Sequence, residues 1–210
     1  MPRRKMPANY DLSILLHPDL LAKIAAYAAD NRIEALTPYI LSAPILKTAA
    51  LSEVSLNRLC VDYRDDFASW SNTSSPYYFL YRKLVRAKNS YALYVESVKL
   101  AFNVGELDAA IYILENVTYI HPQARFMYIM LCFSAGKSCL KDELALKREF
   151  KFREIESLGR EIITHIEAIQ PRREDTYSDT WYSEDFPECW EEHHWLEEFN
   201  GKRCRICILW

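Results

Sequence analysis

The amino-acid sequence predicts an all-α protein. Its 210 residues include only four glycines against nine prolines, whereas an all-β fold usually needs glycine at many of its turns. Apolar residues recur at three- and four-residue steps along much of the chain, which is the spacing of one face of an α-helix. Two segments that end at Gly105 and Gly136 also resemble each other. Half of the residues are hydrophobic, which is enough to bury one good core or two small ones.

Residues 1–62 predict a module of three short helices. Pro18 and Asp19 are suited to the first turn of the first helix. A second apolar set is interrupted by Pro38, and a third follows Pro44. None of these helices is long enough to be stable alone, so they must pack together. The apolar residues of the three sets are Leu15, Leu16, Leu20, Leu21, Ile24 and Ala28; Ile33, Leu36, Ile40 and Leu41; and Ile45, Leu46, Ala49, Ala50, Leu51 and Val54.

Residues 79–170 predict an antiparallel helical-repeat domain. Ala92 and Ala124 lie thirty-two positions apart, within the period range of tetratricopeptide-like repeats. Bulky apolar residues follow each alanine, and each copy ends at a glycine suited to a left-handed helix end. Segment 144–169 is amphipathic and would form a terminal capping helix, with its apolar stripe made by Leu158, Ile162, Ile166 and Ile169. Residues 63–78, rich in serine, predict a linker between the two helical parts.

The tail, residues 171–210, is acidic and aromatic and has no helical period. It contains four of the five tryptophans, which suggests that it folds back onto something. A Cys-x3-His pair and a Cys-x2-Cys turn could supply four ligands for one structural zinc ion. The alternative is that these cysteines are surface thiols without a metal. The candidate zinc ligands are Cys189, His193, Cys204 and Cys207.

The first two parts of the chain together resemble the F-box proteins of plants that carry a helical-repeat region. The resemblance covers about two thirds of the chain. It implies an F-box-like module that docks on a Skp-type adaptor and through it on a cullin, while the repeat region holds an unknown protein target. The matching segments are Asp19 to Ile24, Ala35-Leu36, Leu41-Ser42, Val54 to Leu56, Tyr81 to Val85, Ala87, Asn89, Ala92 to Tyr94 and onward to Gly136. The adaptor-binding residues that the resemblance implies are Leu16, Pro18, Leu20, Leu21, Ile24, Leu36 and Leu41.

Two features of the box differ from the family. His17 stands where the family usually has proline, and Ala43-Pro44 stands where it usually has Cys-Lys. The sequence therefore leaves a second reading open, in which the chain is a helical-repeat interaction scaffold without a ubiquitin role. Tyr81, Tyr91 and Tyr94 could bind a partner in either reading, because tyrosine is a common interface anchor. The alternative is that these rings pack between helices.

The sequence predicts a binding protein rather than an enzyme. It shows no nucleophile with a base, no paired carboxylates in an apolar pocket and no phosphate-binding glycine loop. His121 is expected to begin a helix and His165 to be solvated. The net charge of -3 does not favour nucleic acid as a partner. With no run of eighteen apolar residues and no signal-peptide pattern, we expect a cytoplasmic or nuclear protein that does not enter a membrane.

Overall fold

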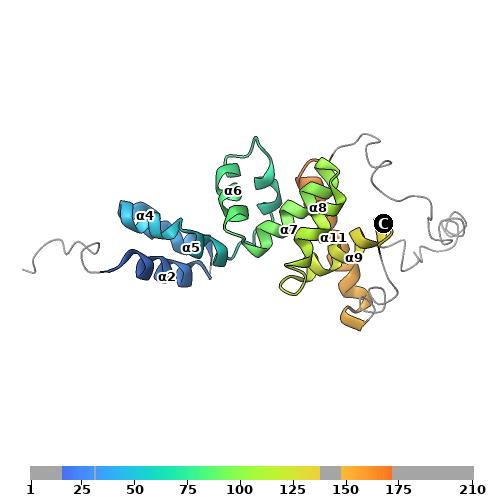
Figure 1. The fold of residues 1–210 in the computed structure, drawn as a ribbon, viewed down its shortest axis with the longest axis horizontal. Coiled ribbons are helices and arrows are strands. Elements are labelled where there is room, and N and C mark those ends of the chain that lie inside the picture. Colours follow the sequence, from blue (N-terminus) through green and yellow to red (C-terminus); the bar gives the residue numbers. More distant parts are fainter. Residues whose placement is uncertain (1–15, 31, 138–147, 172–210) are drawn as a thin grey trace, which may run out of the picture. The chain divides into compact units, whose positions relative to one another are not determined.

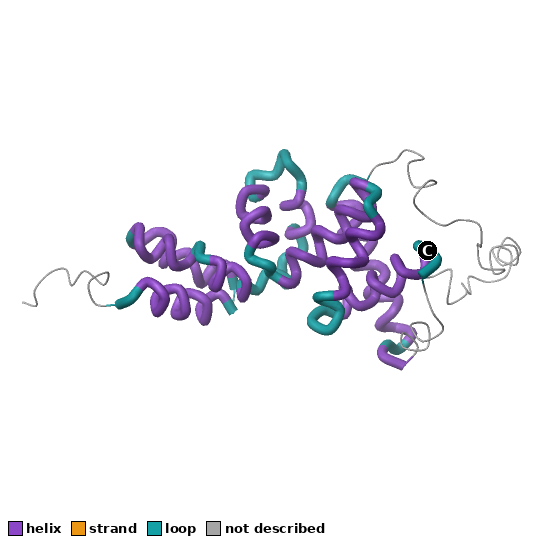
Figure 2. The backbone as a smooth tube through the Cα atoms, viewed as in Figure 1, coloured by secondary structure: helices purple, strands orange, loops and turns teal. Residues whose placement is uncertain are grey.

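The computed structural model describes residues 16–30, 32–137 and 148–171 (Figure 1). Throughout these ranges the secondary structure is helical, without a strand (Figure 2), so the all-α prediction is confirmed for the described part of the chain. The described residues divide into two compact units. The first unit contains residues 16–30, 32–64 and 82–89, and the second contains residues 65–81, 90–137 and 148–171.

The first unit is built around helix α2. Pro18 is the first residue of α2, and His17 caps the helix by accepting a hydrogen bond from the amide of Asp19. Helix α2 packs against α4, α5 and η1, and α3 packs against α4 and η1. The second apolar set is divided beside Pro38, as expected: η1 ends before it, and Pro38 lies in the first turn of α3, where proline is tolerated. The bounds are α2 Pro18–Ala29, η1 Ile33–Leu36, α3 Thr37–Ser42, α4 Pro44–Ala50 and α5 Glu53–Arg58.

Small residues let these helices approach closely. Ala25 and Ala29 on α2 and Ala50 on α4 are fully buried. The buried Ser55 on α5 donates its hydroxyl to the carbonyls of Ala22, at 3.1 Å, and Ala49, at 2.8 Å. This one side chain therefore bonds to both neighbouring helices and leaves no unpaired hydroxyl in the core.

Segment 82–89 is attached to α5 by two asparagines. The buried amide of Asn89 lies 2.9, 3.2 and 2.7 Å from the carbonyls of Leu56, Asn57 and Leu59. In return, the Asn57 amide donates to the carbonyls of Ala87 and Lys88, each at 2.9 Å. These bonds satisfy the carbonyls at the end of α5, which have no partners within the helix.

The second unit is built around helix α7. Helices α8, α9 and α11 and the short helices η2 and η3 all contact α7. The two alanines of the predicted repeat, Ala92 and Ala124, are both fully buried. The bounds are η2 Phe67–Ser71, α7 Ser90–Lys99, η3 Leu100–Val104, α8 Leu107–Glu115, α9 Pro122–Ser134 and α11 Phe152–Ala168; α6, Tyr78–Arg86, has residues in both units.

Several predicted helix boundaries of the second unit are confirmed. Gly105 and Gly136 have φ angles of 89° and 64°, in the left-handed region that favours glycine. His121 precedes α9, and Pro122 is the first residue of that helix. Of the stripe predicted for the terminal helix, Leu158, Ile162 and Ile169 are buried and Ile166 is half-buried.

The predicted linker is not an exposed connection. Phe67 and Trp70 from this segment are fully buried, and η2 packs against α7 and α11. The amide of Asn72 also donates to the carbonyl of Ala168 at 2.9 Å. Burial of these two large aromatic side chains stabilises the folded state more than solvent exposure of the polar serines would. The serine-rich composition therefore gave the wrong boundary, and residues 65–78 belong to the second unit.

The amide of Asn89 is expected to contribute strongly to the stability of the first unit. Replacing Asn89 with alanine leaves buried carbonyls of α5 without a donor, so unfolding should become easier by about 1–3 kcal/mol. The matched control is Asn116→Ala, which removes a single exposed bond to the carbonyl of Tyr112. Urea unfolding should show little change for the control. Equal losses in the two variants would contradict the role assigned to Asn89.

Candidate protein-interaction site

Helix α2 presents apolar side chains on two opposite faces. Leu21, Ala25 and Ala29 face the core of the first unit. The other side carries three apolar residues at helical spacing, Leu20, Ile24 and Tyr27, which are 45%, 39% and 67% exposed. These three residues are here called the α2 stripe. A helix that is apolar on all sides is normally buried on all sides. The α2 stripe is therefore a surface suited to being covered by another molecule.

Tyr27 is held in place by a neighbouring ion pair. The guanidinium of Arg58 lies 4.8 Å from the centre of the Tyr27 ring, within the range of a cation–π contact. Arg58 donates two bonds to the carboxylate of Asp30, the first from its Nε at 2.8 Å. The hydrogen bond to Asp30 is the main cause of a raised pKa of Arg58. These contacts connect the aromatic end of the stripe, on α2, to Arg58 on α5.

The predicted adaptor-binding residues fall into two groups. Leu20, Ile24 and Leu41 are exposed, as is Pro18, and Leu16 is half-buried. Leu21 and Leu36 are buried in the core of the first unit. These two residues therefore pack inside the first unit, and the exposed part of the predicted set is Pro18, Leu20, Ile24 and Leu41. Sequence spacing alone does not distinguish the two faces of α2, since both are apolar.

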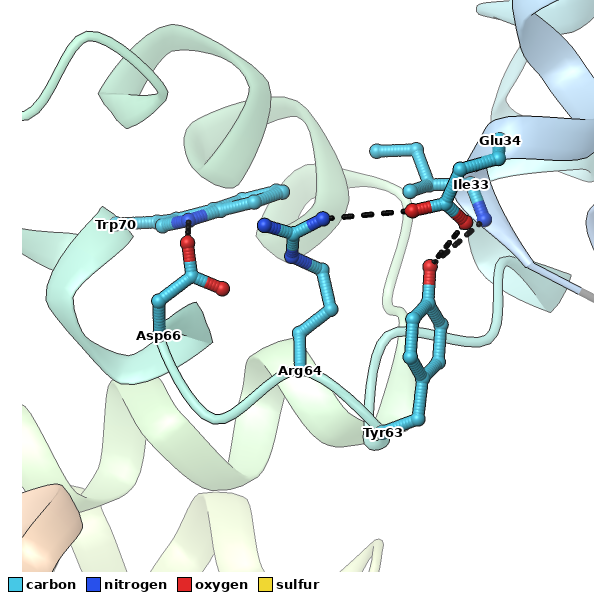
Figure 3. Close-up of polar contacts among 6 residues, drawn as sticks. All are labelled: Ile33, Glu34, Tyr63, Arg64, Asp66 and Trp70. Carbon is cyan, nitrogen blue, oxygen red and sulfur yellow. Dashed lines mark hydrogen bonds and ion pairs between the residues drawn. The ribbon is translucent and has the colours of Figure 1, made fainter.

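A second polar cluster, which the sequence did not reveal, connects η1 to the chain after α5. The hydroxyl of Tyr63 donates to the Glu34 carboxylate at 2.6 Å and accepts from the amide of Ile33 at 3.3 Å (Figure 3). Arg64 pairs with the same carboxylate at 3.5 Å. The bond from Tyr63 is the main cause of a lowered pKa of Glu34. These residues therefore connect separate parts of the first unit.

The three tyrosines predicted as partner contacts lie in the core of the second unit. Tyr81, Tyr91 and Tyr94 are almost completely buried, so none can serve as a surface anchor. Tyr81 donates its hydroxyl to Glu96 at 2.6 Å. The rings of Tyr81 and Tyr91 pack against that of Phe67. Trp70, beside them, donates to Asp66 at 3.1 Å (Figure 3). The alternative reading of these tyrosines, core packing between helices, is what the structure shows.

His165 is buried rather than solvated. Only 6% of its surface is exposed, and its Nδ1 and Nε2 lie 2.9 and 3.4 Å from the hydroxyls of Tyr94 and Tyr91. Burial lowers the pKa of His165, against the opposing effect of Glu161 and Asp65. Burial also raises the pKa of Tyr94 well above its ordinary value. His165 continues the buried series Leu158 and Ile162 at helical spacing, and this pattern could have identified it.

A serine and a histidine that are far apart in the sequence meet in the second unit. The Oγ of Ser90 lies 2.8 Å from the Nε2 of His121, and the His121 ring packs edge-on against that of Tyr91. Ser90 begins α7 and His121 precedes α9. The contact joins the starts of two helices that also pack along their lengths. Its location gives it a structural role in the arrangement of α7 and α9.

The predicted zinc ligands Cys189, His193, Cys204 and Cys207 lie outside the described residues. Among the residues that are described, no group of three or more His, Cys, Asp or Glu side chains is arranged to hold a metal ion. Within the same ranges, no helix has the length and apolar character needed to cross a membrane.

Because His165 is buried, we expect the stability of the protein to depend on pH. The ordinary pKa of histidine is near 6.5, and the folded protein holds that of His165 lower. Folding therefore favours neutral His165. The stability that neutral His165 contributes to the folded protein is fully present above the ordinary histidine pKa, and it is lost as the pH falls below that pKa. The thermal unfolding midpoint of the wild type should fall more steeply from pH 7.5 to 5.5 than that of His165→Gln.

The control for this pH series is Asn116→Ala, which leaves every titratable side chain in place. This variant should keep the pH dependence of the wild type. A His165→Gln variant whose midpoint follows the wild-type curve would show that another group causes the loss of stability.

The α2 stripe has the properties of a binding surface. The aromatic and histidine clusters of the second unit are buried and support its core. The stripe is exposed, apolar and held rigidly at its aromatic end. No protein-family model, no curated protein and no solved structure matches this chain.

Proposed function

We propose that this protein is a substrate-recruiting F-box subunit of a Skp-cullin-F-box ubiquitin ligase. In this proposal the first unit binds a Skp-type adaptor through the α2 stripe, and the second unit holds a protein target. The observation that carries the proposal is the unpartnered apolar face of α2. When a partner removes exposed leucine, isoleucine and tyrosine side chains from water, the free energy of binding becomes more favourable.

The composition of α2 supports a protein partner for this face. Only Asp19 and Lys23 are charged among its twelve residues, although half of the helix faces outward. A surface helix normally carries charged and polar residues on its outer side. The adjoining Tyr27 and Arg58 belong to the residue types most often found as interface hot spots. Leu41, exposed on α3, is a further apolar side chain of the same unit.

The reaction served by such a complex takes place on another subunit. The protein would contribute by holding a target lysine near a ubiquitin-charged enzyme, so the rate gain comes from proximity and orientation. Because Tyr81, Tyr91 and Tyr94 are buried, the target must bind elsewhere on the second unit. The exposed aromatic side chains of this unit include Tyr112 and Tyr119.

The double variant Leu20→Asp with Ile24→Asp tests the docking face. Two carboxylates in the stripe would have to be desolvated on binding, so adaptor capture should be lost. Both residues point away from the core, so the helical circular dichroism of the variant should match that of the wild type. Co-expression with a plant Skp-type adaptor, followed by size-exclusion chromatography, measures capture.

The matched control is Ile163→Asp, which changes an exposed isoleucine on α11 of the second unit. This control should still form the complex. Unchanged capture by the double variant would refute the docking face. A folded wild-type chain that never captures the adaptor would refute the ligase proposal and favour an interaction scaffold with no ubiquitin role.

A further inference from the structure

Charge is divided between the two units in a way that the net charge of the chain conceals. The described residues of the first unit contain nine Lys and Arg against five Asp and Glu, a formal charge of +4. Those of the second unit contain seven against eleven, a formal charge of -4. Between Lys99 and Arg125 the chain has no lysine or arginine, whereas it has the carboxylates of Glu106, Asp108 and Glu115. The acidic character of the second unit therefore extends to α8 and the turns on either side of it.

Helix α8 is covered on its inner side and exposed on its outer side. The inner side is buried and consists of Leu107, Ala110, Ile111 and Leu114. On the outer side the ring of Tyr112 is 70% exposed, and Asp108 and Glu115 are exposed with it. Asp108 lies four residues before Tyr112 and Glu115 three residues after it, which places all three on one face of the helix. Asp108, Tyr112 and Glu115 are here called the α8 face.

Lys137 and Tyr128 border the α8 face from α9 and its end. The Nζ of Lys137 lies 2.5 Å from the carboxylate of Asp108, and the hydroxyl of Tyr128 donates to Glu115 at 3.5 Å. The bond to Asp108 is the main cause of a raised pKa of Lys137, to which Glu115 also contributes. The pair of Lys137 and Asp108 is exposed, and such pairs contribute little to stability, so an incoming cation can share this carboxylate.

The α8 face keeps a negative charge after this pairing. Lys137 offsets one of its two carboxylates. Arg125, the cation within α9, donates two bonds to the carboxylate of Glu149, at 3.1 and 3.3 Å. An exposed tyrosine ring between two carboxylates therefore remains available on the surface of the second unit.

We propose that the α8 face holds the target, and that a basic segment of the target binds there with an arginine or lysine side chain against the ring of Tyr112. A cation over a tyrosine ring is attracted by its π electrons, and the carboxylates of Asp108 and Glu115 add charge-assisted hydrogen bonds. Arginine fits better than lysine, because its planar guanidinium stacks on a ring and bonds a carboxylate through two donors. This inference rests on the proposed function, since it identifies the occupant with the ligase target.

A basic protein segment fits this face better than other occupants do. A second copy of the chain would bring a second Asp108 and Glu115 to the contact, and like charges across an interface oppose binding. Residues 172–210 contain ten Asp and Glu against five Lys and Arg, so they would also bring a net negative charge. Nucleic acid is disfavoured for the same reason. The exposed Tyr119 and Ile120, in the turn after α8, offer apolar surface to the neighbours of the bound cation.

The test is a selection of random dodecapeptides, displayed on phage, with the full chain as bait. Counter-selection on the double variant Tyr112→Ala with Glu115→Gln removes peptides that bind elsewhere. The selected peptides should be rich in arginine and lysine. In fluorescence anisotropy, the double variant should bind them about tenfold more weakly than the wild type. Both substituted side chains are exposed, so the helical circular dichroism should not change.

Two substitutions of Tyr112 separate a cation site from a merely apolar contact. Tyr112→Phe keeps the aromatic ring and should bind the selected peptides as the wild type does. Tyr112→Leu keeps an apolar side chain without a ring and should lose about threefold in affinity. Equal affinities of the phenylalanine and leucine variants would overturn the role of the ring.

The matched control is Glu167→Gln, which removes an exposed carboxylate of the second unit on α11. This control should keep the wild-type affinity. Equal weakening by Glu167→Gln and Glu115→Gln, selected peptides without cations, or no selected peptide would overturn the inference.

The proposed function is tested separately, because the double variant leaves the α2 stripe intact and should still form the complex with a plant Skp-type adaptor. Adaptor capture without binding of basic peptides would refute the inference alone. Basic peptides bound at the α8 face, with no adaptor complex, would refute the ligase and support this face as the binding site of a scaffold.

Discussion

Each unit of this protein depends on the packing of short helices around one central helix. In the first unit α2 contacts α4, α5 and η1, and in the second α7 contacts η2, η3, α8, α9 and α11. Helices of six to seventeen residues are marginal when isolated, so burial against a central helix supplies most of their stability. The two central helices differ in one respect. The apolar side chains of α7 are mostly buried, whereas α2 keeps an exposed apolar face.

That difference separates the helix whose apolar side chains are covered within its own unit from the helix that we propose binds a partner. The second unit uses its aromatic and titratable residues internally: His165 bonds to Tyr91 and Tyr94, and Phe67 packs against the same core. The first unit has a core made largely of alanine and leucine, with Ser55 bonding its helices together. Its larger side chains, Leu20, Ile24 and Tyr27, remain outside this core. A partner that covers them would complete the burial that the unit itself does not achieve.

The local structure could be predicted from the sequence better than the tertiary contacts. Pro18, Pro122, Gly105 and Gly136 mark helix ends because each has a backbone preference that no distant residue changes. Burial was harder to predict. Leu20 and Leu21 are equally apolar and adjacent, and only the positions of α4 and α5 decide which of them enters the core.

The same limit explains the errors in the second unit. The residues of segment 65–78 are mostly polar, yet burial of Phe67 and Trp70 outweighs that composition. The tyrosines assigned to a partner are core residues because other helices cover them. The total charge of -3 hides opposite charges on two units whose boundary crosses α6.

The measurement that tests the account most directly is photo-crosslinking from the stripe. With p-benzoylphenylalanine in place of Tyr27, the protein should crosslink to the Skp-type adaptor; in place of Tyr112, which is 70% exposed in the second unit, it should not. A crosslink from position 112 and none from position 27 would contradict the assignment of α2 as the docking helix.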